Sequence, residues 1–187
     1  MSEIPYQSFF NLSVDMLCIA GMDGYFKQLN PAWSRTLGFT EAELLARPYM
    51  DLVHPDDRAS TAAEAENLTS GSTTVHFRNR YLCRDGSYRW LAWTATPAES
   101  TKLIYAVARD ITQEMEAEDQ LRAATLAADR RLALLAALVD AIGIGVLLID
   151  HDLKVAYWNK EATRLTGIPM EKALGAPARE IGQALSG

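Results

Sequence analysis

Residues 54–58, with the sequence His-Pro-Asp-Asp-Arg, hold the side chains most suited to chemistry. Two carboxylates beside a histidine could perform general acid–base catalysis, which needs groups within hydrogen-bond reach of the reacting atoms. Asp56 and Asp57 are better explained as caps of a helix predicted over 59–68, because carboxylates at a helix N-terminus bind its free N–H groups and suit its dipole. We interpret His54 as a capping or salt-bridging residue in preference to a metal ligand.

Other chemical motifs are incomplete. Gly143-x-Gly145 lacks a third glycine and follows a helix, which is the wrong context for dinucleotide binding. The sequence contains no phosphate-binding glycine-rich loop, no Cys-x-x-Cys pair and no histidine followed by Glu-Leu-Arg-Thr-Pro. Cys18 and Cys83 lie in separate predicted strands, as is typical of buried free thiols in a reducing compartment. We predict no catalytic residue and no metal site in this chain.

A predicted strand over 74–84 carries the candidate binding residues. Alternation places Val75, Phe77, Asn79, Tyr81 and Cys83 on one face and Thr74, His76, Arg78, Arg80 and Leu82 on the other. Together with the next strand, the inward face supplies the candidate pocket residues Phe77, Asn79, Tyr81, Cys83, Leu91 and Trp93.

Two of these residues are polar. A buried polar group without a partner costs about 1–3 kcal/mol, so Asn79 and the Tyr81 hydroxyl each need a ligand, a water or a protein partner. An apolar ligand pocket between the sheet and the short helices satisfies this requirement. A fully packed core in which Tyr81 bonds the backbone satisfies it equally well.

The elements that position these residues form an α+β pattern. Two short strands over 17–29 precede a set of short helices, and three strands follow over 74–84, 88–96 and 103–111, the first two joined by the tight turn Asp85-Gly86. We predict a five-stranded antiparallel sheet with short helices packed on one face. Residues 1–15 form a short amphipathic helix that covers a sheet face or meets a partner chain.

Residues 113–142 predict one long helix. No glycine or proline interrupts 113–141, and about 30 residues would extend roughly 45 Å. Apolar residues recur every seven positions and define a heptad seam: Leu121, Ala128, Leu135 and Ile142, with a parallel row of Ala117, Ala124, Arg131 and Leu138. We favour a parallel coiled coil joining two subunits, and a helix folded back over the sheet remains the alternative because Arg131 makes the seam partly polar.

An internal repeat divides the chain. Six of the 32 residues in 17–48 recur 129 positions later in 146–177, without a gap: Asp23/Asp152, Asn30/Asn159, Arg35/Arg164, Gly38/Gly167, Leu45/Leu174 and Pro48/Pro177. We predict an N-terminal helix at 1–15, a domain at 16–112, a helical segment at 113–142 and the incomplete start of a second domain at 143–187. Since half a sheet cannot bury its apolar face, we expect the chain to be a fragment of a longer protein.

Composition excludes several partners. A formal net charge of −6 argues against nucleic acid and anionic membranes, and no apolar run is long enough to span a bilayer. The first residues lack the basic start of a signal peptide. We therefore expect a cytoplasmic protein.

The motifs together resemble a PAS domain with its C-terminal PAC segment, a signalling helix and the start of a second PAS domain. The matching residues are Asp23-Gly24, Asn30-Pro31-Ala32, Gly38-Phe39, residues 54–58, residues 84–90 (Arg-Asp-Gly-Ser-Tyr-Arg-Trp) and Asp110-Ile111-Thr112. The resemblance implies a sensory module that binds a small molecule, a light-sensitive cofactor or a partner chain. It passes the signal through the helix to a C-terminal output domain in the same polypeptide, of which a histidine kinase is the preferred type. A ligand-free dimerisation and relay module of a sensor kinase or diguanylate cyclase is the alternative, and a haem-based gas or redox sensor is a further one.

The resemblance also allows cofactors to be tested by position. The reactive cysteine of flavin photoreceptors corresponds to Tyr49, and the polar residues that hold the flavin ring correspond to Tyr81, Leu91 and Ala108, so a flavin of that type is not expected. Haem requires an axial ligand. The helix that carries it in the related oxygen sensors has no histidine here, which leaves Cys18, Cys83 or Met50 as substitutes. The cofactor is left unassigned.

Signal relay is expected where the last strand meets the long helix. Arg109, Asp110 and Thr112 lie at this junction, where an ion pair of Arg109 and Asp110 would set the exit angle of the helix, although a plain surface pair is equally consistent. Trp90 and Tyr88 are expected to meet the N-terminal helix or a dimer partner. The predicted homodimer interface comprises Phe9, Trp90, Leu121, Ala128, Leu135 and Leu138.

Overall fold

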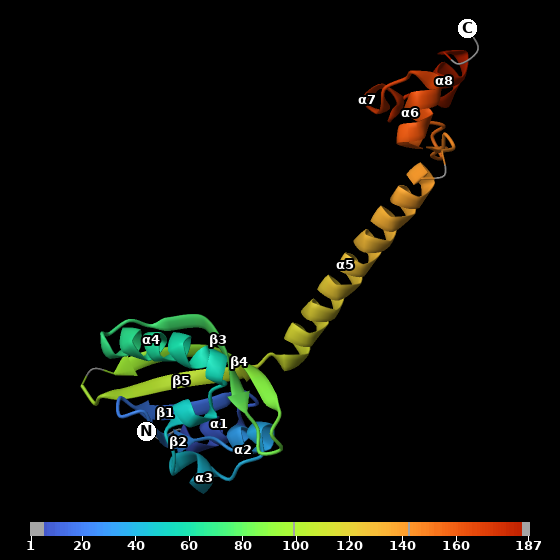
Figure 1. The fold of residues 1–187 in the computed structure, drawn as a ribbon. Coiled ribbons are helices and arrows are strands. Elements are labelled where there is room, and N and C mark those ends of the chain that lie inside the picture. Colours follow the sequence, from blue (N-terminus) through green and yellow to red (C-terminus); the bar gives the residue numbers. More distant parts are fainter. Residues whose placement is uncertain (1–5, 99, 142, 185–187) are drawn as a thin grey trace. The chain divides into compact units, whose positions relative to one another are not determined.

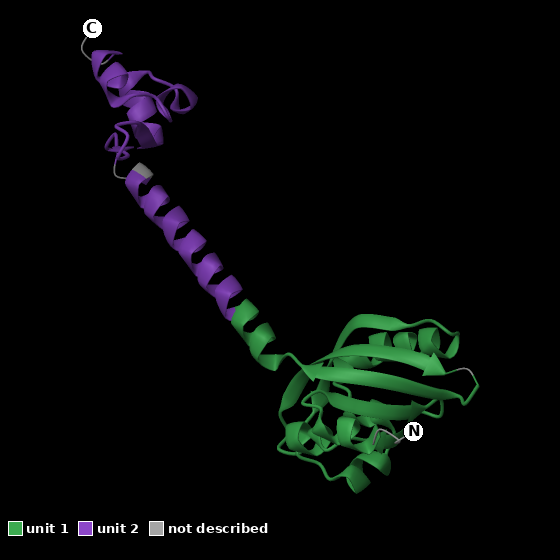
Figure 2. Ribbon diagram, turned by 180° about the vertical axis from the view of Figure 1, so that it is seen from behind, with its two compact units in different colours: residues 1–119 green, residues 120–187 purple. Residues whose placement is uncertain are grey.

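The computed structural model describes residues 6–98, 100–141 and 143–184. It divides the chain into two compact units, residues 1–119 and 120–187, which we call the first and second units (Figure 2). The expectations that concern residues 1–5, Ile142 and residues 185–187 lie outside the described residues.

The first unit is built on a five-stranded sheet in which every neighbouring pair of strands is antiparallel. Its strands are β1 (Met16–Gly21), β2 (Phe26–Leu29), β3 (Thr74–Leu82), β4 (Tyr88–Ala98) and β5 (Leu103–Asp110), in the order β2-β1-β5-β4-β3. The predicted five-stranded antiparallel sheet is therefore confirmed. β5, the last of the five strands in the sequence, is the central strand of the sheet, as its nearly continuous apolar sequence favours.

Short helices connect the two halves of the sheet (Figure 1). They are α2 (Ala32–Leu37), α3 (Glu41–Leu45), the 3-10 turns η1 (Tyr49–Leu52) and η2 (Pro55–Asp57), and α4 (Arg58–Thr69), while α1 (Tyr6–Leu12) precedes β1. Gly38 ends α2 with φ +80°, a conformation that favours glycine. Thr40 begins α3 with a full capping box, because its hydroxyl accepts from the Glu43 N–H and the Glu43 carboxylate accepts from the Thr40 N–H.

The main core lies between one face of the sheet and these helices. Trp33 of α2, Leu44 of α3 and Leu52 of η1 are fully buried there, against inward residues of the central strands such as Met16 and Leu91. Burial of these large apolar side chains supplies the principal favourable term for folding of the unit.

One strand departs from the predicted alternation. His76 takes a left-handed conformation (φ +64°), and the pairing of β3 with β4 shifts between Val75 and Phe77. This β-bulge exchanges the faces of the residues that precede it, so that Thr74 is buried and Val75 is exposed. The expectation that Val75 points inward and Thr74 outward was therefore wrong, because strict alternation holds only in an unbroken ladder.

The long helix α5 (Thr112–Ala141) is continuous, and the second unit then contains β6 (Leu147–Ile149), β7 (Val155–Trp158), α6 (Lys160–Thr166), α7 (Met170–Ala173) and α8 (Ala178–Ala184). β6 and β7 form a two-stranded antiparallel sheet. A small core packs around Val155, Trp158 and Ile181. Within the described part of the chain, no helix has the length and hydropathy needed to cross a bilayer.

Candidate functional site

A cavity of about 70 Å³ lies between the sheet and α4. Small side chains on the inward faces of three adjacent strands leave this space: Ala20 on β1, Ala95 on β4 and Ala106 on β5. They are neighbours because Ala95 pairs directly with Ala106, and Ala106 pairs with Cys18, two residues before Ala20. Thr61, Ala65 and Leu68 close the cavity from α4.

Aromatic rings form most of the remaining wall. Phe26, Tyr49, Phe77, Tyr81 and Trp93 all line the cavity. Tyr81 and Trp93 are in ring contact, with centroids 5.4 Å apart, and Phe26 contacts Tyr49 at 5.7 Å. The cavity is therefore apolar apart from a few hydroxyl groups, an amide and one carboxylate.

The Asn79 amide is already satisfied by the protein. Its Nδ2 donates to the Thr61 hydroxyl of α4 at 3.0 Å, and its Oδ1 accepts from the Trp93 indole N–H at 2.7 Å. A buried amide with two such partners has no need of a ligand. Of the two polar residues considered from the sequence, only Tyr81 is left to be explained.

Tyr81 is 2% exposed and lines the cavity. Its hydroxyl makes no hydrogen bond with any of the described residues, yet no fully sealed polar side-chain atom in that part of the protein lacks a partner. The hydroxyl therefore keeps some accessible surface, and Tyr81 is one of the residues that line the cavity. Burial raises the pKa of Tyr81 well above its usual value, which keeps the phenol protonated and able to donate.

Two of the predicted pocket residues lie elsewhere. Phe77, Asn79, Tyr81 and Trp93 line the cavity, but Leu91 is fully buried in the core and Cys83 lines a separate surface hollow beside Gly38. Cys83 follows the end of β3, where the Leu37 carbonyl at the end of α2 accepts from the next N–H, that of Arg84. Leu91 pairs directly with Asn79, which lines the cavity, but its own side chain is packed in the core.

Several lining residues were missed by sequence reasoning. Cys18 and Ile104 could have been found from the period-two pattern of their strands, and Thr61, Ala65 and Leu68 from their helical spacing. Glu64 shares that helical spacing. Thr74, whose hydroxyl donates to the Glu64 carboxylate at the cavity, could not have been found, since the bulge at His76 turns it inward.

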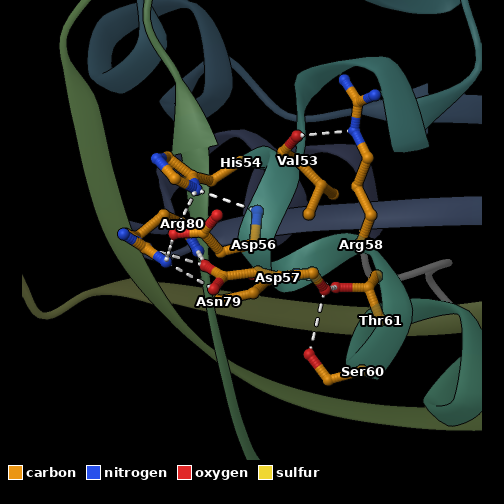
Figure 3. A network of polar contacts seen from close by, with 9 residues as sticks. All are labelled: Val53, His54, Asp56, Asp57, Arg58, Ser60, Thr61, Asn79 and Arg80. Atoms are coloured by element: carbon orange, nitrogen blue, oxygen red, sulfur yellow. Dashed lines mark hydrogen bonds and ion pairs between the residues drawn. The ribbon is translucent and has the colours of Figure 1, made fainter.

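A polar network fastens α4 to β3 next to the cavity (Figure 3). The Asp57 carboxylate accepts hydrogen bonds from the Arg80 backbone N–H (2.8 Å), Nε (2.9 Å) and Nη2 (2.7 Å). The Arg80 hydrogen bonds lower the pKa of Asp57 below its usual range. Asp57 was expected to cap α4, but its side chain makes no capping hydrogen bond and binds Arg80 of β3 instead.

His54 provides the capping role proposed for it. Its Nδ1 accepts from the Asp56 N–H at 3.2 Å at the start of η2. Its ring stands edge-on to Tyr88, with centroids 4.5 Å apart, and the Arg80 guanidinium lies 5.2 Å from the centre of the Trp90 ring. Tyr88 and Trp90 thus have ring contacts within their own unit.

The junction of β5 and α5 is held by neighbouring strands. The Asp110 carboxylate accepts from the Thr112 N–H (3.0 Å) and hydroxyl and pairs with Arg89 of β4 at 3.1 Å, while the Thr112 hydroxyl accepts from the Trp90 N–H. Arg109 instead pairs with Asp15, just before β1, at 3.0 Å. The expected ion pair between Arg109 and Asp110 was wrong, because successive strand residues point to opposite faces.

The cavity does not fit the cofactors considered. Sites for drug-sized molecules occupy about 300–1,000 Å³, well above the 70 Å³ found here. Cys18 is the one candidate axial ligand on its wall, and burial raises the pKa of that thiol to about 12, which disfavours the thiolate that binds iron. Cys83 and Met50 are not among the lining residues, so haem and flavin find neither room nor ligands in this conformation.

Sequence comparison places this geometry in a family. Residues 26–108 match one family model described as the PAS fold, and residues 133–180 match a second model with the same description. The chain belongs to the PAS family. The first PAS match runs from β2 into β5 and includes the network around Asp57, whereas the second begins within α5 and ends within α8.

Two curated proteins are related over much of the chain. A probable diguanylate cyclase, DgcE of Escherichia coli K12, is 23% identical over 172 residues, which cover 90% of this chain and 15% of that protein. The sensor histidine kinase TmoS of Ectopseudomonas mendocina is 24% identical over 125 residues, covering 64% of the chain and 13% of the kinase. The PAS chain thus spans a small part of the length of these relatives.

Solved structures agree on the fold. A domain of a sensory box histidine kinase/response regulator from Geobacter sulfurreducens is 24% identical with a TM-score of 0.51, covering 56% of this chain and 90% of that one. The PAS domain of an HTR-like protein from Haloarcula marismortui is 22% identical with a TM-score of 0.50, covering 56% and 93%. The chain is a PAS sensory module of the kind found in signal-transduction proteins, and a PAS domain is not itself catalytic.

Proposed function

We propose that the first unit senses a small molecule in the cavity and relays its state through α5 to a C-terminal output domain. One observation carries the proposal: the strands that line the cavity also hold the start of α5. β4 contributes Trp93 and Ala95 to the cavity and Arg89 and Trp90 to the junction, while β5 contributes Ile104 and Ala106 before it reaches Asp110. A shift of these strands on ligand binding changes the cap of α5.

The relay acts in a homodimer that pairs through α5 in parallel. Support comes from the exposed leucines along its heptad seam, Leu121, Leu135 and Leu138, which leave apolar surface for a second copy. Phe9 of α1 is also exposed and extends the proposed interface, whereas the Trp90 ring packs against Arg80 and contributes less than first expected. We place the protein in the cytoplasm and favour a histidine kinase as its output, with a diguanylate cyclase as the alternative.

Cysteine crosslinking of the full chain tests the dimer. Leu121→Cys lies on the seam, and Leu126→Cys, also on α5 and exposed, lies five positions further on and off the seam. A parallel coiled coil predicts a disulfide-linked dimer for Leu121→Cys and none for Leu126→Cys. The native thiols Cys18 and Cys83 are buried and do not interfere. Equal crosslinking of both variants would contradict the proposal that the heptad seam faces the partner helix.

Native mass spectrometry with an ultraviolet–visible spectrum of the purified chain tests sensing. A bound non-protein mass, together with a change in Leu121→Cys crosslinking when it is removed, supports the sensory role. A ligand-free relay module is the second candidate, favoured by the small cavity and by the internal satisfaction of Asn79. It predicts no bound mass and no response of crosslinking to a small-molecule extract of cells.

A further inference from the structure

The cavity's size, its charge and the free hydroxyl of Tyr81 together restrict what it can bind. Since the inference concerns the ligand of the same cavity, it rests on the proposed sensory function. We propose that the cavity selects a neutral molecule of about three non-hydrogen atoms that accepts a hydrogen bond from Tyr81.

Volume sets the size limit. An engineered cavity of about 150 Å³ holds benzene, with six carbon atoms, so a cavity of 70 Å³ holds about half as many atoms. The rigid aromatic rings around it, among them Trp93 and Tyr81, make expansion costly because they also contact Trp33 in the core.

Charge complementarity excludes ions. Among the residues that the structure describes, no arginine, lysine or histidine lines the cavity, so no cationic side chain there pairs with an anion. Glu64 is the one charged residue at the wall, and both of its oxygens already accept hydrogen bonds, one from the Thr74 hydroxyl and one from the Asn67 amide at 3.3 Å. An unpaired ion in such an apolar space loses its hydration without compensation.

The Tyr81 hydroxyl supplies the specificity. Tyr81 is almost fully buried at the cavity and its hydroxyl has no partner among the described residues, whereas the Asn79 amide is hydrogen-bonded to Thr61 and Trp93. A ligand with an acceptor atom satisfies this donor, and a ligand without one leaves it unpaired. Tyr49 also lines the cavity, but its ring is only half-buried and its hydroxyl can be hydrated.

NMR titration of the full chain with matched probes tests the proposal. Acetonitrile is a neutral acceptor of three non-hydrogen atoms, propyne has the same rod shape without a good acceptor, and methylammonium is a small cation. The Trp93 indole N–H, which lines the cavity, is the reporter. We expect a saturable shift with acetonitrile, weaker binding of propyne and no saturable binding of methylammonium.

Tyr81→Phe isolates the hydroxyl and keeps the ring. Binding of acetonitrile should weaken about five- to tenfold, which corresponds to the loss of one hydrogen bond. Tyr105→Phe removes an exposed phenol hydroxyl from the same sheet and should leave binding unchanged. The melting temperature of Tyr81→Phe should not fall, because no protein partner is lost; a clear fall would reveal such a partner and overturn the proposal.

Other results overturn the inference in separable ways. Equal binding of acetonitrile to Tyr81→Phe, or equal binding of propyne and acetonitrile, removes the role of the hydroxyl. Tighter binding of methylammonium assigns recognition to Glu64. Absence of any saturable binding refutes the size class. The proposed sensory function survives each of these results if the purified chain carries a larger ligand, and fails only when crosslinking at Leu121→Cys responds to no ligand.

Discussion

Asn30 in the first unit and Asn159 in the second make matching hydrogen bonds. Asn30 Oδ1 accepts from the Leu17 N–H at 3.0 Å, and Asn159 Oδ1 accepts from the Val146 N–H at 2.8 Å. Their amide groups donate to backbone carbonyls two residues further back, Asp15 at 2.9 Å and Ile144 at 2.8 Å. The strand pairing of residues 18 and 29 likewise recurs at 147 and 158.

The two copies nevertheless differ in burial. Cys18 and Ala20 of β1 are 3% and 5% exposed, whereas Leu147 and Ile149 at the equivalent positions of β6 are 39% and 48% exposed. β1 is paired on its second edge with β5, and β6 is paired only with β7 among the described residues. The comparison teaches that the repeated stretch forms its local structure without a complete sheet, while burial requires the later strands.

The tryptophans of the two copies have exchanged places. The first unit has Leu29 and Trp33, and the second has Trp158 and Ala162 at the equivalent positions, all four of them buried. A large side chain at one position is thus balanced by a small one at the other. Such compensation keeps the volume of a close-packed interior constant.

The largest expected effect comes from breaking this exchange. Trp33→Ala should destabilise the first unit by about 3–5 kcal/mol, because it leaves a cavity at a fully buried site. The double variant Leu29→Trp with Trp33→Ala copies the second unit and should recover part of the loss. Urea unfolding followed by hydrogen exchange of β1 and β5 amides measures both. A double variant less stable than Trp33→Ala would contradict volume compensation.

Asn30→Ala should cost about 2–3 kcal/mol, since it leaves the Leu17 N–H and the Asp15 and Phe10 carbonyls without their side-chain partner in a buried region. Asn159→Ala is the matched variant in the second unit. Among the described residues, Asn159 also makes three hydrogen bonds, to Val146, Ile144 and Ala162, but Ile144 is 58% exposed. Water can therefore replace part of the side chain's role, and a smaller loss is expected. Hydrogen exchange of the Leu17 and Val146 amides reports each site; a larger loss at Asn159 would refute the comparison.

Asp57→Asn tests the Asp57–Arg80 hydrogen bonds of the first unit, which lie outside the repeated stretch. Loss of the charged hydrogen bonds to Arg80 should cost about 2 kcal/mol at neutral pH. Because Arg80 lowers the folded-state pKa of Asp57, its contribution is complete above the unfolded-state pKa and is lost as the pH falls through the lower folded-state value. The free energy of unfolding in urea should therefore fall more steeply below about pH 4 for the wild type than for the variant. Parallel pH profiles would exclude this role.

The smallest effect concerns helix capping. Thr40→Ala removes the capping box of α3 and should cost about 1 kcal/mol. The second unit has Pro169 and Lys172 at the equivalent positions, and Pro169 makes no side-chain cap. Pro169→Thr with Lys172→Glu should therefore stabilise α7 by a few tenths of a kcal/mol to about 1 kcal/mol. Thermal unfolding measures both: the melting temperature should fall for Thr40→Ala and rise for the double variant.

Local features were determined by the sequence alone. The approximate positions of the five strands of the first unit, the turn at Asp85-Gly86 and the unbroken helix over 113–141 were all predicted, because each depends on neighbours within a few residues or on a simple period. The internal repeat likewise predicted a second copy of the same local structure, which residues 147–184 contain.

The binding cavity was decided by tertiary structure. The bulge at His76 brought Thr74 inward, and the register of β4 and β5 placed Ala95 opposite Ala106, with Ala20 of β1 two residues beyond the partner of Ala106. The Asp57 carboxylate likewise binds Arg80 and does not cap the helix. These outcomes depend on which residues, far apart in the chain, are paired across strands, and a one-residue shift of register exchanges the faces of a strand.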